Sequence, residues 1–206
     1  MDERAKWESR YKAADEPFYG HAPSAFLAQS LELLPRPGRC LDLGGGEGRN
    51  ALYLASLGWE VTVADVAVAG LARARALCRS AAPKISLVAA DLTATPLRPR
   101  LNSVDLILVI NFHHRNTIRL AAEWLRPGGA LLVEGFALEQ LGRPSGGPRD
   151  PRHLWEPNEL LSLAEGLRVK WYEDREVAGD DNPRHRGARW VVRMIASREA
   201  GISLSA

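Results

Sequence analysis

A run of three glycines, Gly44–Gly46, constrains the fold of this chain more than any other feature of its 206 residues. It follows the short apolar segment Cys40–Leu43, and a segment with helical spacing begins after Gly48. Glycine lacks a Cβ atom and tolerates positive φ, so the pattern suits a sharp turn from a strand into a helix. Backbone N–H groups at the start of that helix can then contact a ligand directly. The pattern predicts a ligand-binding turn, and a glycine-rich turn without a ligand is the alternative.

The spacing of the glycines separates two classes of nucleotide-binding turn. The dinucleotide fingerprint Gly-x-Gly-x-x-Gly, counted from Gly44, requires a third glycine where Arg49 stands. The pattern that fits is Asp42-x-Gly44-x-Gly46-x-Gly48. This pattern resembles motif I of the class I S-adenosylmethionine-dependent methyltransferases. The resemblance implies that the glycines line the methionine part of the cofactor.

Composition and charge are those of an ordinary globular domain. Hydrophobic residues make up 46% and charged residues 25%, and the length suits one domain with a sizeable core. The formal net charge of +2 is too small to predict a nucleic-acid or membrane partner. Cys40 and Cys78 are the only cysteines, so neither a disulfide framework nor a metal site is expected. Because no apolar run reaches the length of a membrane span and no leader is apparent, we expect a cytoplasmic protein.

Apolar periodicity predicts strands that alternate with helices over most of the chain. The near-continuous apolar run Val104–Ile110 is typical of a strand covered on both faces in a parallel sheet. The last two strands are joined by the short polar segment Gly179–Arg184, which implies an antiparallel pair. The expected strands are residues 39–43, 59–65, 85–90, 104–110, 130–136, 167–173 and 188–195, and the expected helices are residues 1–12, 24–34, 48–57, 68–80, 117–125 and 157–165.

Two aspartates stand at the ends of predicted strands, where a nucleotide would lie. Asp65 follows Asp42 by 23 positions, where a nucleotide-binding β-α-β unit keeps the carboxylate that accepts hydrogen bonds from ribose hydroxyls. Capping of the next helix is the alternative role for this aspartate. Asp91 closes the third strand, and a turn-forming role is its alternative.

Over residues 4–198 the chain resembles a small bacterial class I methyltransferase and is similar to the tellurite-resistance branch. Besides the glycine pattern and the two aspartates, the segments Leu125–Gly129 and Glu156–Leu160 carry this resemblance. The first of these segments is expected to form a tight turn before the fifth strand. Gly45 departs from the cysteine or alanine more often seen in that branch, but the glycine spacing is intact.

The resemblance implies an α/β fold, a Rossmann-like three-layer α/β/α sandwich. Its seven-stranded, mostly parallel sheet has the order 3-2-1-4-5-7-6, with strand 7 antiparallel. We expect one domain over residues 1–206, made of an N-terminal helical lid (1–37), a cofactor-binding core (38–136), a substrate-side loop (137–156) and a C-terminal helix with an antiparallel strand pair (157–198).

S-adenosyl-L-methionine is the cofactor that the resemblance implies. An aspartate at the position of Asp91 contacts the adenine amino group in the family, while the neighbouring backbone brackets the ring. The expected cofactor-binding residues are Asp42, Gly44, Gly45, Gly46, Gly48, Asn50, Asp65, Val66, Asp91, Leu92, Asn111 and Phe112.

Candidate catalytic residues come from the strand ends, because ligands in open α/β sheets bind outside the carboxyl ends of the strands. His113 or His114, with a pKa near neutrality, is a candidate to accept a proton from the acceptor, and Glu134 is a second candidate base. A loop or capping role is the alternative for the two histidines. The candidate substrate-binding residues are Tyr19, Arg115 and Arg152.

The aromatic residues near the N-terminus have two alternative interpretations. Trp7 and Tyr11 form an aromatic staple that docks the first helix, or they belong to a leader that packs over the cofactor, as in the family. Phe112, Tyr19 and Trp7 are candidates to place an aromatic face near the sulfonium. The segment Tyr19–Pro23 resembles the lid element of the family.

These features together predict a methyltransferase that acts on a small molecule, through an O, N, S or chalcogen oxyanion acceptor. Neither proline of the DNA amino-methylating motif follows Asn111, and no cysteine follows a proline as cytosine C5 methylation requires. We therefore expect no nucleic-acid or membrane partner, and a monomer or homodimer. A non-catalytic protein that binds S-adenosylmethionine is the main alternative. A nicotinamide-dependent oxidoreductase is a further alternative, although the missing third glycine argues against it.

Overall fold

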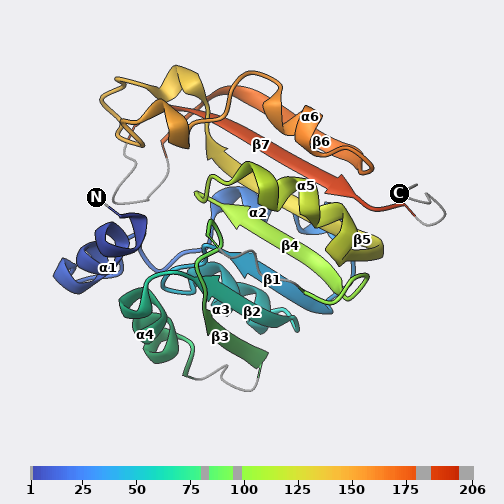
Figure 1. The fold of residues 1–206 in the computed structure, drawn as a ribbon, viewed down its shortest axis with the longest axis horizontal. Coiled ribbons are helices and arrows are strands. Elements are labelled where there is room, and N and C mark those ends of the chain that lie inside the picture. The colour runs from blue at the N-terminus through green and yellow to red at the C-terminus, as the bar shows by residue number, and fades with distance from the viewer. Residues whose placement is uncertain (1, 80–83, 95–98, 180–186, 200–206) are drawn as a thin grey trace.

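A seven-stranded sheet in the order β3-β2-β1-β4-β5-β7-β6 organises the chain (Figure 1). Strands from β3 to β5 pair in parallel, and β7 pairs antiparallel with both β5 and β6. The predicted fold class and strand order are therefore confirmed. The computed structural model describes residues 2–79, 84–94, 99–179 and 187–199. The strands are β1 (Arg39–Leu43), β2 (Glu60–Asp65), β3 (Ile85–Ala89), β4 (Val104–Ile110), β5 (Leu125–Phe136), β6 (Arg168–Val177) and β7 (Arg189–Ser197).

Helices cover both faces of the sheet and complete three layers. On one face, α2, α3 and α4 pack through a core cluster that includes Leu27, Leu54 and Leu71. On the other face, α5 and α6 pack through a second cluster that includes Ile118 and Leu160. The helices are α1 (Glu3–Ala13), α2 (Ala25–Gln29), α3 (Arg49–Ser56), α4 (Val68–Leu77), α5 (Arg115–Trp124) and α6 (Glu159–Leu163), with short 3-10 turns η1 (Leu31–Leu33), η3 (Leu138–Gln140) and η4 (Pro151–His153).

Strand β4 lies at the centre of the core, with all of its residues buried. Leu106 and Leu108 join the cluster on one face of the sheet, and Ile107 and Val109 join the cluster on the other. Fully burying one such side chain contributes about 1.5–3 kcal/mol. Burial on both faces holds β4 rigidly in the sheet. The polar residues that directly follow β4 therefore have a well-defined position.

The segment Leu125–Gly129, which we expected to form a tight turn before the fifth strand, is the irregular first part of β5. It pairs irregularly with β4, with a register shift between Val104 and Leu106. Gly128 takes a positive φ of 84° and donates its N–H to the Arg198 carbonyl at 2.7 Å. The chain therefore bends within this segment, and regular pairing with β4 begins at Ala130.

Helix ends differ from the expected ones at several places. Ser24 is the N-cap of α2, as expected, and its hydroxyl accepts a hydrogen bond from Leu27 N. That helix ends at Gln29 instead of residue 34. The last helix begins at Glu159, because Asn158 adopts a left-handed conformation with φ of 61°. Three expected features lie outside the described residues, namely the helix end at Ser80, the loop position of Pro96 and residues 180–184 of the last connection.

Helix α1 packs against α4 at the edge of the molecule, beside the carboxyl ends of the parallel strands (Figure 1). Its N-cap is Asp2, whose carboxylate accepts a hydrogen bond from Arg4 N. Arg73 of α4 contacts the carbonyl of Ala14 and lies 3.3 Å from the carbonyl of Glu16, so it ties down the end of α1. None of the helices in the described part of the chain combines the length and hydrophobicity needed to cross a bilayer.

Candidate active site

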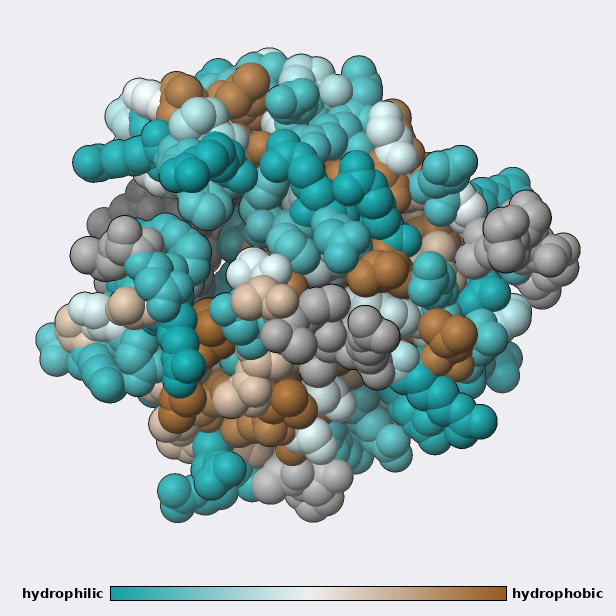
Figure 2. Space-filling view, viewed as in Figure 1, coloured by the Kyte–Doolittle hydropathy of each residue, from teal (hydrophilic) through white to brown (hydrophobic). Residues whose placement is uncertain are grey.

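A cavity of about 980 Å³ opens at the carboxyl ends of β1, β2, β4 and β5. The space-filling view shows the molecule hollowed on the side where α1 lies (Figure 2). The volume of the cavity is at the upper end of the range of ligand pockets, about 300–1,000 Å³. The predicted site residues that line the cavity are Gly44, Gly45, Gly46, Asn50, Asp65, Val66, Asp91, Leu92, Asn111, Phe112, His113, Tyr19 and Arg152.

The glycine turn lines the cavity, but the reason for its glycines differs from the expected one. Gly44 and Gly46 adopt positive φ values of 70° and 54°. A Cβ atom on Gly44 would lie 2.7 Å from Phe112, and one on Gly46 would collide with the Tyr11 hydroxyl. Aromatic side chains of the protein therefore pack where Cβ atoms of these two residues would lie. The three glycines still line the cavity.

The Asp65 carboxylate faces the glycine turn from the end of β2. Its Oδ2 atom accepts a hydrogen bond from Gly46 N at 2.9 Å, and its Oδ1 atom accepts one from Ala67 N at 2.8 Å. Burial raises the pKa of this carboxyl, and the backbone hydrogen bonds oppose the rise. The Ala67 bond is the expected alternative role, at the start of α4. Each carboxylate oxygen has a second lone pair for a ligand hydroxyl.

Asp42 lies behind the turn and does not line the cavity. It is only 1% exposed, and burial followed by the nearby Asp65 charge raises its pKa to about 7. Its Oδ2 atom is buried and has no hydrogen-bond partner among the described residues. A carboxyl without partners in this position is costly unless it is protonated or bonded to a ligand or a water molecule.

The Asp91 carboxylate forms a turn, which is the alternative that the sequence left open. Its Oδ1 atom accepts hydrogen bonds from Thr93 N, Thr93 Oγ1 and Ala94 N at 2.7–3.1 Å. These bonds lower the pKa of Asp91, so the carboxylate is charged near neutral pH. Asp91 and the buried Leu92 both line the cavity.

The other predicted cofactor residues divide into two groups. Asn50, Val66, Asn111 and Phe112 line the cavity, and Asn50 also accepts a hydrogen bond from Ser24 N at 2.9 Å. Gly48 does not line the cavity, because it packs toward α4 at the start of α3.

His113 lines the cavity but lacks the neutral pKa that we expected. Its ring packs on Trp155 with a centroid distance of 4.0 Å, and its Nε2 atom is buried. Burial, assisted by the positive charge of Arg115, lowers the pKa of His113 to about 4. The imidazole is therefore neutral at physiological pH and only a weak base.

Three further candidates lie outside the cavity. His114 is the N-cap residue of α5, and its Nδ1 atom lies 2.8 Å from the Thr117 hydroxyl. Glu134 is buried on β5 and pairs with Arg193 at 3.1 Å. Arg115 forms an ion pair with Glu159 that joins α5 to α6. The His114 contact fits the capping alternative, and the other two contacts are structural, so we do not propose catalytic or substrate roles for these residues.

Aromatic side chains that the sequence did not assign to the acceptor site also line the cavity. Phe18 packs edge to face on Tyr19 at 5.0 Å, and Trp7 lies 6.0 Å from Phe18. Phe136 and Trp155 line the side formed by β5 and the segment after it. The sequence could have placed Phe136 at the site, because this residue ends a predicted strand. It gave no indication for Trp155, because that residue follows a long loop.

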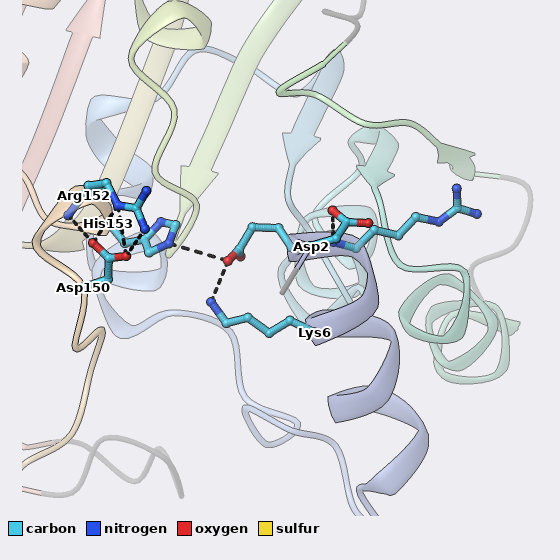
Figure 3. Close-up of polar contacts among 7 residues, drawn as sticks. Asp2, Lys6, Asp150, Arg152 and His153 are labelled. Atoms are coloured by element: carbon cyan, nitrogen blue, oxygen red, sulfur yellow. Dashed lines mark hydrogen bonds and ion pairs between the residues drawn. The ribbon is translucent and has the colours of Figure 1, made fainter.

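Contacts between α1 and the segment after β5 bridge the mouth of the cavity (Figure 3). Glu3 Oε1 lies 3.6 Å from His153 Nε2 and 2.8 Å from Lys6 Nζ. Arg152 pairs with Asp150 at 2.6 Å, so this predicted substrate residue is held within its own loop. The mouth is thus crossed by an ion pair whenever His153 is protonated.

Comparison with known proteins supports the fold and the turn. Residues 40–129 match a family described as "Methyltransferase domain". "Ribosomal RNA small subunit methyltransferase G" of Prochlorococcus marinus is 27% identical over 178 residues, which cover 83% of this chain and 65% of that protein. "Ribosomal RNA small subunit methyltransferase C" of Alcanivorax borkumensis is 34% identical over 121 residues, or 52% of this chain and 36% of that protein. The chain thus spans less than two thirds of the length of these curated relatives.

Solved structures share the fold at low sequence identity. TehB from Haemophilus influenzae superimposes with a TM-score of 0.67 at 18% identity, covering 97% of this chain and 68% of TehB. A structure described as "Conversion of a Disulfide Bond into a Thioacetal Group during Echinomycin Biosynthesis" gives a TM-score of 0.71 at 17% identity, covering 98% of this chain and 94% of the other. At these identities the likeness establishes the architecture alone.

Proposed function

We propose that the protein is a class I S-adenosylmethionine-dependent methyltransferase that transfers a methyl group to a small-molecule acceptor. Residues 40–129 match a methyltransferase domain family, which supports this proposal. The cofactor of this family is S-adenosyl-L-methionine. Its sulfonium supplies both the methyl group and the leaving group. The protein therefore contributes mainly alignment and the exclusion of water.

The residues at the cavity fit the cofactor in three places. Asp65 would accept hydrogen bonds from the ribose, since its carboxylate faces the turn and has lone pairs to spare. The backbone of Gly44–Gly46 would carry the methionine part. Asp91 and Leu92, which close the strand next to β2, would flank the adenine.

A proton acceptor on the protein is not part of the proposed mechanism. His113 has a pKa of about 4 and a buried Nε2 atom, so it removes protons poorly at neutral pH. Its neutral ring, stacked on Trp155, instead forms an apolar wall beside the reaction centre. We propose that the acceptor is held there among aromatic side chains.

The observation that carries the small-molecule assignment is the bridged mouth. Glu3 and His153 approach to 3.6 Å across it, from α1 and from the segment after β5. A polymer would have to displace this bridge and the helix behind it. The formal net charge of +2 also gives little attraction for RNA. A small molecule fits the cavity without displacing the bridge or the helix.

A methyl-transfer assay with isotope-labelled cofactor tests this proposal. The protein would be incubated with a panel of small O, N, S and oxyanion acceptors and, in parallel, with small ribosomal subunits. We expect label in a small-molecule product, and less of it with Asp65→Ala at the same subsaturating cofactor concentration. Label in ribosomal RNA alone would refute the small-molecule assignment. Binding of S-adenosylhomocysteine without turnover on either panel would favour a non-catalytic binding protein.

A further inference from the structure

We infer that Tyr11 is a further cofactor-binding residue, whose hydroxyl donates a hydrogen bond to the ribose diol opposite Asp65. This inference rests on the proposed function, because it concerns the same cofactor. It assigns to α1 a role beyond covering the site, since one of its own side chains contacts the ligand.

The position of the Tyr11 ring leads to this inference. Tyr11 is only 4% exposed, yet it lines the cavity. A Cβ atom on Gly70 would lie 2.8 Å from Tyr11 Cε2, and one on Gly46 would collide with the hydroxyl. The ring is therefore wedged between α4 and the glycine turn, with its hydroxyl end at the turn.

The hydroxyl end lies among groups that bind a nucleoside. Gly46 touches the Tyr11 hydroxyl on one side and donates its N–H to Asp65 on the other. Tyr11 lines the cavity, and its hydroxyl oxygen is not one of the fully buried polar atoms that lack a partner in the described part of the chain. A polar atom of a ligand in the cavity can therefore accept a hydrogen bond from this hydroxyl.

Asp65 and Tyr11 offer complementary hydrogen-bonding groups to a ribose. Asp65 offers only acceptors, whereas a phenol offers a donor as well. Burial and the negative charge of Asp65 raise the pKa of the Tyr11 hydroxyl, so it keeps its proton at physiological pH. A ribose diol has hydroxyls that donate to the carboxylate and oxygens that accept from the phenol.

The same geometry couples α1 to the ligand. Apart from Tyr11, α1 is held to α4 by Glu8 in its middle and by the Ala14 carbonyl at its C-terminal end, and Glu3 also reaches the loop across the mouth. A hydrogen bond from Tyr11 to the cofactor adds a contact that exists only in the complex. Cofactor binding then tightens the docking of α1, by the amount that the bond contributes.

Calorimetric titration of the full chain with two ligands tests the inference. The first is S-adenosylhomocysteine, and the second is methylthioadenosine, which keeps the ribose and lacks the amino acid. We expect Tyr11→Phe to weaken both by about two- to tenfold, the range for one hydrogen bond. Tyr53→Phe is the matched control, because Tyr53 lies half-buried on α3 and does not line the cavity. It should leave both affinities unchanged.

Hydrogen exchange over residues 3–13 gives a second readout. We expect S-adenosylhomocysteine to slow exchange in α1 of the wild type and to slow it less in Tyr11→Phe. Unchanged affinities in a folded Tyr11→Phe variant, or equal protection of α1 in both proteins, would overturn the inference. A loss confined to S-adenosylhomocysteine would place the contact at the amino acid end and overturn the ribose assignment. If the wild type binds neither ligand, the proposed function itself fails.

Discussion

Glu8 of α1 caps the N-terminus of α4 by accepting a hydrogen bond from Ala69 N at 3.0 Å. The N-cap residue of α4, Ala67, has no side chain that can do this. A helix N-terminus has unsatisfied N–H groups and a partial positive charge, so a carboxylate from another helix is well placed there. The first helix of the chain therefore caps α4, the helix that follows β2.

We expect Glu8→Ala to lower the free energy of unfolding by about 1 kcal/mol, as the loss of a helix cap does. Urea unfolding followed by circular dichroism measures this change. Glu16→Ala is the control, because it removes the same charge from an exposed side chain near the end of the same segment. Equal effects of the two substitutions would show that Glu8 does not act as a cap.

The buried pair of Glu134 and Arg193 is expected to be structural. Both side chains are 9% exposed, and Arg193 also pairs with Glu173 at 2.8 Å. Removing one partner leaves a buried charge, so Glu134→Ala should cost about 3–5 kcal/mol in unfolding free energy. Glu176→Ala breaks the more exposed pair with Arg143 and should cost less than about 1 kcal/mol.

Glu134→Gln separates this role from catalysis. If the variant folds normally and binds S-adenosylhomocysteine but loses methyl transfer, Glu134 is a base after all, and our assignment is wrong.

His113 should make stability depend on pH between about 6.5 and 4. Its pKa is lowered from 6.5 to about 4, so the unfolded chain binds its proton first as pH falls. The stabilisation is present above pH 6.5 and is lost as pH falls through 4. The full shift corresponds to roughly 3 kcal/mol, which partial solvent exposure reduces to about 1–2 kcal/mol.

Denaturant unfolding of wild type and His113→Gln at several pH values isolates this contribution. The stability of the wild type has to be compared with that of His113→Gln because Asp42 also titrates over this range. The pKa of Asp42 is raised to about 7, so protonation of this carboxyl increases the free energy of unfolding as pH falls, opposite to the effect of His113. We expect the wild type to lose stability relative to His113→Gln as pH falls. Parallel curves for the two proteins would rule out a depressed pKa. His21→Gln, at an exposed position, serves as the control.

Asp65→Ala should weaken binding of S-adenosylmethionine by about 1.5–3 kcal/mol, the scale of hydrogen bonds to a charged group. Calorimetry measures the affinity, and an unfolding curve shows whether loss of the Gly46 and Ala67 bonds also loosens the turn. Asp150→Ala removes an aspartate at the cavity mouth and should leave the affinity nearly unchanged. An unaltered affinity of Asp65→Ala would remove this residue from the site.

Local sequence patterns predicted the architecture because its determinants are local. The apolar run of β4 follows from burial on both faces, and the glycine pattern follows from positive φ. Asp65 could be placed because a strand end fixes where its side chain stands. The same reasoning was incomplete at Leu125–Gly129, because the bend there is part of β5 and Gly128 also bonds to the distant Arg198 carbonyl.

The chemistry of the site was less predictable, because it depends on contacts between residues far apart in the sequence. Glu134 looks like a free acid at a strand end until Arg193 is placed beside it. The low pKa of His113 comes from burial against Trp155, which no local pattern reveals. Tyr11 looked like a docking residue because only the folded chain brings it to Gly46.

Helix α1 and the C-terminal end of β7 lie on opposite sides of the molecule, and this should guide how the protein is produced (Figure 1). Asp2 and Glu3 line the mouth, so an affinity tag fused before them would crowd the entrance and disturb the Glu3 bridge. Ser197 pairs with Ala130 at the amino end of the parallel strands, away from the cavity. A purification tag placed after β7 should therefore report native binding, whereas an uncleaved one at the other end should weaken it.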